Sequence, residues 1–134
     1  MTKLRQRLSN EEGFTLIELL IVIVIIGILL AIAVPSYLGF KDRANKRAAQ
    51  SDLREAIPTA EAYYSDNGKY GGLTQAVMLT IDSGMSTQVS VAKATTSGYC
   101  LQAVVGNQQW SVAGPGAVWH KSNNCGGAAV SVNA

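Results

Sequence analysis

The chain has 134 residues, of which 48% are hydrophobic, and its formal net charge at neutral pH is +2. This length suits a single domain, and so small a net charge does not by itself indicate a nucleic-acid ligand. The apolar residues are concentrated before Phe40. What remains is short, so one thin hydrophobic core is the most to expect of the globular part.

Residues 14–34 form an almost wholly apolar run whose one charged side chain is Glu18. As a helix this run would extend about 32 Å, which matches the ~30 Å hydrocarbon core of a bilayer. A lone segment can satisfy its backbone groups in lipid only as a helix. We therefore predict a membrane-spanning helix over residues 14–36 and a globular domain over residues 37–134.

Residues 1–13 carry Lys3, Arg5 and Arg7 and suggest the charged start of a secretory signal peptide. The apolar run that follows is about twice as long as a signal-peptide core, and no clean small-residue cleavage site follows it. The processing signal lies before the run, at Gly13. A cut there would remove residues 1–13 as a leader peptide and keep the apolar helix.

The sequence GFTLIE at residues 13–18, with the apolar run and Pro35 behind it, resembles the class III signal of type IV pilins and pseudopilins. The resemblance implies that a prepilin peptidase cuts between Gly13 and Phe14 and methylates the new amine of Phe14. It also implies the further partners: the lipid bilayer before assembly, a membrane assembly platform with its ATPase, and copies of the chain in a helical filament.

Glu18 has a role under this hypothesis, because an ionised carboxylate buried without a partner is costly and finds a cation. No Lys or Arg lies near it on the helix, but cleavage creates the α-amino group of Phe14. Glu18 of one subunit would meet the Phe14 amine of a neighbour and fix the register between apolar helices. The alternative is that Glu18 sits at the membrane interface, where the helix N-terminus favours an anion.

Cys100 and Cys125 are the only two cysteines, and both lie in the C-terminal part. A disulfide between them would stabilise the domain by ~3.5 kcal/mol and requires an oxidising compartment. The alternative is a pair of free, buried thiols.

Basic residues flank the apolar run on both sides, so the positive-inside rule does not choose an orientation. The disulfide places the C-terminal domain outside and the leader in the cytoplasm, and the resemblance implies an extracellular pilus as the final location.

Beyond the apolar run, small and apolar residues recur at a helical period as far as Tyr64, which predicts that the helix continues with one polar face. Pro35 should kink or break the helix, and Gly27 is a second weak point. Pro58 should add a bend within the domain. The resemblance implies that the stretch between Gly27 and Pro35 loses its helical structure when subunits pack into a filament.

After a turn at Asn67-Gly68 and a loop with one short helix in residues 73–84, the pattern changes to strands. Four short runs, at residues 88–94, 99–105, 109–113 and 117–120, are separated by turn sequences. They predict an antiparallel meander that covers the second half of the helix. The predicted fold is therefore α+β, with a long N-terminal helix packed against a sheet of about four strands.

The sequence indicates no catalytic, cofactor or metal site, and we predict that the protein is not an enzyme. The single histidine, His120, is expected at a surface position of a strand. Two cysteines so far apart with one histidine do not make a zinc site. Trp110 and Trp119 could stack on DNA bases, but core packing or mutual contact is the better interpretation. Nucleic acid stays possible and is not indicated.

Three functional hypotheses follow. The first is a structural subunit of a type IV pilus, and the second is a pseudopilin of a type II secretion or competence apparatus. The third is a membrane-anchored minor pilin that binds DNA or a surface. Glu18 favours a subunit of the filament shaft, because tip subunits of the resembling family more often lack it.

Overall fold

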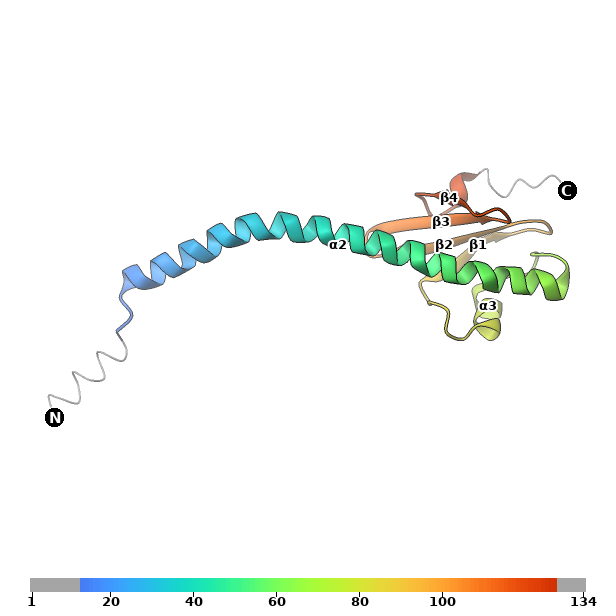
Figure 1. Cartoon of the computed structure of the whole chain (residues 1–134), viewed down its shortest axis with the longest axis horizontal. Helices are drawn as coiled ribbons and strands as arrows, with labels where there is room; N and C mark the ends of the chain where they lie inside the picture. The colour runs from blue at the N-terminus through green and yellow to red at the C-terminus, as the bar shows by residue number, and fades with distance from the viewer. Residues whose placement is uncertain (1–12, 128–134) are drawn as a thin grey trace, which may run out of the picture. The chain divides into compact units, whose positions relative to one another are not determined.

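The structure is a computed structural model that describes residues 13–127 (Figure 1). The leader residues before Gly13 and the Gly/Ala-rich tail after Gly127 lie outside the described part. The elements, in chain order, are α2 (Leu16–Asn67), α3 (Gln75–Ile81), β1 (Val89–Ala94), β2 (Tyr99–Val105), β3 (Gln108–Gly114), β4 (Val118–His120) and a short 3₁₀ turn, η1 (Cys125–Gly127).

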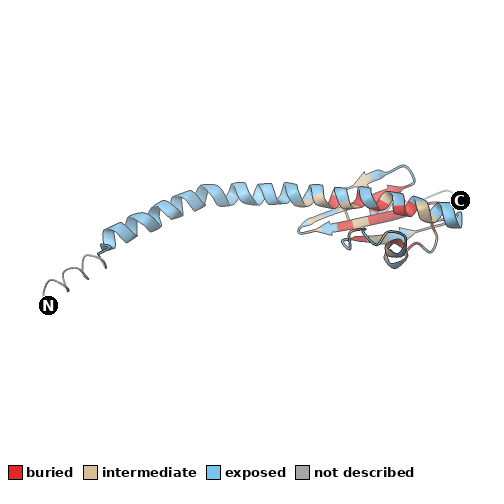
Figure 2. Ribbon diagram, turned by 60° about the horizontal axis from the view of Figure 1, so that its bottom comes forward, coloured by how far each residue is buried: buried red, intermediate tan, exposed pale blue. Residues whose placement is uncertain are grey.

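The chain divides into two compact units at Gly39 and Phe40, and each is described by itself. Of the first unit, the structure describes Gly13 to Gly39, most of which is the N-terminal part of α2. Its large apolar side chains are exposed throughout, as the uniform pale blue of this part in Figure 2 shows. Among the described residues, α2 is the one helix long and apolar enough to cross a membrane.

Helix α2 continues without interruption through Gly27, Pro35 and Pro58. The local break expected at Pro35 is therefore absent from the isolated chain. A proline removes one backbone donor, and the intact hydrogen bonds of the turns on both sides hold the helix together. The Ser36 hydroxyl adds a bond to the Ile32 carbonyl at 3.3 Å. The kink at Gly27 and Pro35 stays a prediction, and so does the loss of helical structure between them when subunits pack into a filament.

In the second unit, residues 40–67 of α2 lie against the sheet, which confirms the predicted α+β arrangement (Figure 1). Small residues on one face of the helix, with Leu53 between them, let the helix approach the strands closely. The helix contributes Ala49, Leu53, Ala56 and Ala60 to the core, all with no exposed surface. Strand residues of the same core are Val89, Tyr99, Leu101, Ala103 and Val112.

The four strands form one antiparallel sheet in the order β1-β2-β3-β4, which confirms the predicted meander. The predicted strand ends differ from the observed ones by at most one residue. Gly106, with φ of 58°, occupies the tight turn between β2 and β3, where glycine adopts positive φ without steric cost. A register shift between Val91 and Lys93 marks an irregularity in the pairing of β1 with β2.

The outer edge of the sheet at β1 is partly covered by a side chain from α3. The Gln75 amide nitrogen donates to the carbonyls of Thr87 at 2.9 Å and of Val89 at 2.6 Å. Helix α3 itself begins at the N-cap Thr74, whose hydroxyl accepts from the Val77 N–H. These bonds satisfy backbone acceptors that a free edge strand would leave open.

Three aromatic rings and one carboxylate tie the end of α2 to the rest of the second unit. The Tyr70 and Tyr99 hydroxyls donate to the two oxygens of Glu61 at 2.9 and 3.2 Å. The Tyr70 ring centre lies 4.6 Å from that of Tyr64 and 4.9 Å from that of Tyr99. Tyr99 also faces Gly114 in the register of β2 and β3, and a Cβ at Gly114 would collide with its ring.

This tyrosine cluster predicts a loss of stability in alkali. Burial, together with the neighbouring Glu61 carboxylate, raises the pKa of Tyr70 to about 12 and raises the pKa of Tyr99 further. The unfolded chain releases these protons near pH 10, so stability is complete below that pH and falls as the pH rises towards 12. Each tyrosine contributes a slope of up to about 1.4 kcal/mol per pH unit. Urea unfolding across this range would measure it, and Tyr99→Phe should show a weaker dependence.

Candidate assembly site at the start of helix α2

The first turn of α2 is closed by a reciprocal pair of hydrogen bonds between Thr15 and Glu18. The Glu18 N–H donates to the Thr15 hydroxyl at 3.2 Å, and the Thr15 N–H donates to a Glu18 carboxylate oxygen at 3.3 Å. This is a capping box, in which a threonine and a glutamate three residues later satisfy two free backbone donors. The carboxylate also lies at the positive end of the helix dipole.

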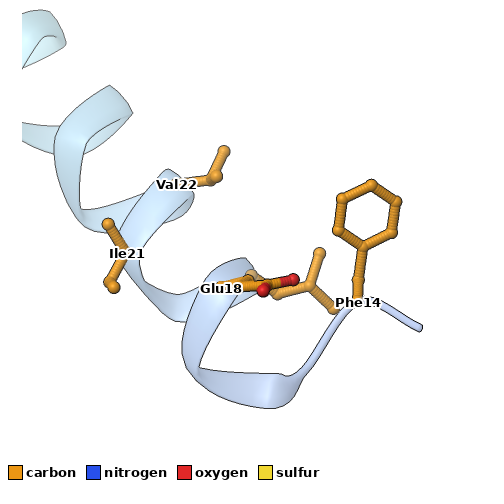
Figure 3. A pocket seen from close by; sticks show the side chains of 5 residues that line it. Phe14, Glu18, Ile21 and Val22 are labelled. Carbon is orange, nitrogen blue, oxygen red and sulfur yellow. The ribbon is translucent and has the colours of Figure 1, made fainter.

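The same carboxylate lies within an otherwise apolar surface. Phe14, Glu18, Leu19, Ile21 and Val22 line a shallow pocket on one face of the helix (Figure 3). The Glu18 side chain points towards Phe14 in this view, and the Phe14 side chain is 76% exposed. An apolar face with one acidic group at its end suits a partner that is apolar and carries one cation.

Glu18 has acceptor capacity beyond the capping box, because a carboxylate offers about four lone-pair sites. One oxygen accepts from the Thr15 N–H, which leaves room for a second donor. Glu18 can therefore cap its own helix and bind a cation at the same time. Glu18 can therefore lie at the membrane interface in the precursor and pair with the Phe14 amine of a neighbour in a filament; the two hypotheses do not exclude each other.

The other predicted site residues lie in different places. Gly13 and Phe14 directly precede the capping box, before the helix begins. Cys100 and Cys125 are joined in a disulfide, with their Cα atoms 6.1 Å apart. They form a small core with Ala113 that is separate from the main core of the second unit. The Ser111 hydroxyl beside them accepts from the Cys125 N–H at 2.9 Å.

Thr15 is the site residue that the sequence prediction missed. The signal was present, since a threonine followed three residues later by a glutamate before an apolar run is typical of a capping box.

The surroundings of the two tryptophans agree with the prediction in part, and those of the histidine differ from it. Trp110 and Trp119 pack against the main core as predicted, but each ring faces a cation of α2. The Lys46 nitrogen lies 5.1 Å from the Trp110 ring centre, and the Arg54 guanidinium lies 5.5 Å from that of Trp119.

His120 is half-buried rather than at the surface, and its Nε2 atom is buried without a hydrogen-bond partner. The turn at Gly126 lies beside its ring.

No group of three or more His, Cys, Asp or Glu side chains that could hold a metal ion occurs within residues 13–127. The candidate site is therefore the acidic, apolar face at the start of α2.

Comparison with known protein families assigns both parts of the chain. Residues 8–34 match the family model described as the prokaryotic N-terminal methylation motif. Residues 35–126 match the family model described as type IV minor pilin ComP, DNA uptake sequence receptor. The first match contains the motif and Glu18, and the second contains the sheet and the disulfide.

Individual relatives agree with this assignment. The chain is 35% identical over 120 residues to the type IV wide pilus major component PilA4 of Thermus thermophilus, covering 87% of this chain and 91% of that one. It is 36% identical over 75 residues to the type II secretion system core protein G of Klebsiella michiganensis, covering 56% and 53%. It is also 35% identical over 75 residues to the type IV major pilin PilA of Myxococcus xanthus, covering 56% and 34%.

No solved structure shows a significant match to the chain. The sequence relationships are sufficient, because one family model covers more than half of the chain and PilA4 is matched over nearly its whole length. The fold found here, a long N-terminal helix with a four-stranded antiparallel sheet, agrees with them. The chain therefore belongs to the type IV pilin family.

Proposed function

We propose that the protein is a structural subunit of a type IV pilus. It is made as a prepilin, inserted in the membrane through residues 14–36, cut after Gly13 and methylated on the amine of Phe14. The subunit then leaves the bilayer and joins a helical filament through its apolar helix. The observation that carries this proposal is the fully exposed apolar part of α2 with Glu18 as its one charge.

The membrane and the filament core offer the same kind of surroundings to this helix. Exposing the apolar side chains of residues 14–38 to water is unfavourable in free energy, and either lipid or neighbouring helices would cover them. A head-to-tail contact between identical subunits does not close on itself and produces an open filament. In such a stack, Glu18 would pair with the Phe14 amine of a neighbour.

A pilus is favoured over a short secretion pseudopilus by the extent of the relationships. The match to PilA4 covers 91% of that pilus component, whereas the match to protein G covers 53% of the secretion protein. Pilins and pseudopilins share the N-terminal helix, so similarity that extends through most of the chain carries more weight. Copies of the chain and a prepilin peptidase are the proposed partners, with a cytoplasmic leader and an outer C-terminal domain.

The N-terminus of the assembled protein tests this proposal. Filaments sheared from cells that express the chain should contain it as the main component. Mass spectrometry should find a chain that begins at Phe14 and carries one extra methyl group. A chain that keeps residues 1–13 in purified filaments, or that never leaves the membrane for a filament, would contradict the proposal.

A second candidate function is DNA capture by a minor pilin, since the family model over residues 35–126 is described as a DNA uptake sequence receptor. Lys46 and Arg54 are exposed and can contact phosphates, but they cover the tryptophan faces that bases would need for stacking. We therefore expect salt-dependent binding. In fluorescence anisotropy with the detergent-solubilised chain, Lys46→Gln with Arg54→Gln should lower the salt slope by about 2. An unchanged slope would exclude these cations as the DNA contacts.

A further inference from the structure

Four basic side chains, Lys41, Arg43, Lys46 and Arg47, follow directly on the apolar part of α2, and all four are exposed. The structure separates them into different faces of the helix. Lys46 lies over the Trp110 ring at the sheet. Arg43 and Arg47 instead line a shallow pocket together with Phe40 and Ala44. This second group is called the arginine stripe below.

The arginine stripe has the geometry of a site for an anion beside an apolar group. Its residues are spaced three or four apart, which places them on one face of the helix. Ala44 is small and leaves space between the two guanidinium groups, while Phe40 is 75% exposed at one end. A guanidinium donates two parallel hydrogen bonds to a phosphate, so two of them one turn apart suit a single phosphate group.

The position of the stripe in the sequence indicates where that phosphate comes from. The proposed insertion covers residues 14–36, and with the Glu18 carboxylate at the membrane interface the ~20 helical residues that cross the hydrocarbon core end near Leu38. Phe40 then falls at the end of the acyl region. Arg43 follows within about 5 Å of helix rise, inside the headgroup layer, and the long side chain of Arg47, about 11 Å along, can reach back towards that layer.

We propose that the arginine stripe binds the headgroup phosphate of an anionic phospholipid, with Phe40 against the acyl chains. The inference rests on the proposed function, because it requires the membrane-inserted precursor. The bound lipid would fix the depth of the subunit before assembly, and it must be released when the subunit enters a filament.

An acidic surface on a second copy of the chain is the competing partner, and the test below includes it as an outcome. Three of the five carboxylates of α2 in this unit accept hydrogen bonds from their own chain, whereas Glu55 and Asp66 are exposed. Asp42 accepts from Asn107 at 2.9 Å, Asp52 accepts from Ser86 at 3.0 Å, and Glu61 accepts from two tyrosines. An anionic bilayer offers its phosphates without breaking such bonds.

Native mass spectrometry of the full-length chain, released from detergent with added lipid, tests the proposal. We expect the chain to retain phosphatidylglycerol over phosphatidylcholine by about tenfold, since each basic side chain at an anionic surface strengthens binding several-fold. Arg43→Gln with Arg47→Gln should abolish this preference. Lys69→Gln with Lys121→Gln removes two equally exposed cations elsewhere and should leave the preference intact.

Four results would overturn the proposal: no lipid preference in the unmodified chain, an equal loss in both double variants, displacement of the lipid by excess inorganic phosphate, or loss of a dimer instead of a lipid in the arginine variant. Alkaline extraction of cell membranes keeps the test separate from the proposed function. If the chain is not retained in membranes, the membrane span itself is wrong. If it is retained but shows no preference, only the headgroup site is wrong.

Discussion

Replacing Glu18 by alanine is expected to lower the yield of assembled filaments by at least about tenfold, which corresponds to a loss of ~1.4 kcal/mol per contact. The precursor should still enter the membrane and should still be cut at Gly13, because the change only removes a charge from an apolar helix. What is lost is the carboxylate that would hold the Phe14 amine of a neighbour. Quantifying sheared filaments against cell-associated protein would measure the effect.

The capping box makes it possible to separate the two roles of Glu18. Glu18→Gln keeps an acceptor for the Thr15 N–H, as glutamine serves in a capping box, but removes the charge. Thr15→Val removes the hydroxyl that accepts from the Glu18 N–H and keeps the charge. If pairing with an amine drives assembly, Glu18→Gln should assemble as poorly as Glu18→Ala, and Thr15→Val should assemble much better. The opposite order would show that the cap is what matters.

Gly13→Asp should block an earlier step than the Glu18 variants do, the removal of the leader peptide, and the same assay can show it. A bulky charged residue at the cut should prevent processing, so that variant should accumulate as uncut precursor in the membrane. The Glu18 variants should accumulate as cut subunits. Mass spectrometry of the membrane fraction distinguishes the two accumulations directly.

Removing the disulfide should be the most damaging single change to the second unit. Cys100→Ala with Cys125→Ala opens a bond between residues 25 apart in sequence, which should cost about 3.5 kcal/mol of unfolding free energy. For a domain of this size such a loss lowers the melting temperature by about 15 °C or more. Circular dichroism of the detergent-solubilised chain during heating would follow it.

A reducing agent gives the matched comparison for this change. Dithiothreitol should lower the melting temperature of the unmodified chain towards that of the double alanine variant, and it should leave the variant itself unaffected. Alanine is the suitable replacement because both cysteines are buried, and a serine hydroxyl there would need a new partner. Equal melting temperatures for the oxidised, reduced and variant chains would show that the bond adds nothing to stability.

The fold was largely predictable because each element has its own local signal. The alternation of apolar and polar residues, together with clear turn residues, predicted the strand ends to within one residue. Helical periodicity predicted that α2 continues beyond the apolar run. The contacts of Lys46 and Arg54 with the tryptophans were not predictable. They depend on the rotation of α2 against the sheet, which periodicity does not fix to the accuracy of one side chain.

Most residues of the candidate site were predictable from the sequence. Gly13, Phe14 and Glu18 follow from the motif, since no other position combines a processing signal with a charge in an apolar run. The spacing of Thr15 and Glu18 does carry the signal of the capping box, although the pairing hypothesis for Glu18 did not use it. The unbroken helix at Pro35 was not predictable, because a proline inside a helix indicates a kink or a break without saying which.

The amide of Gln75 on the carbonyls before and within β1 has a consequence for how filaments of this protein grow. Strand-by-strand pairing between copies is a general hazard for sheets displayed at high local density, and a filament would bring its globular domains close together. Because Gln75 occupies these two acceptors, a strand of an adjacent subunit would find no free carbonyl at this end of the β1 edge. Gln75 thereby works against edge-to-edge growth of the sheet there and favours contacts through the apolar helices.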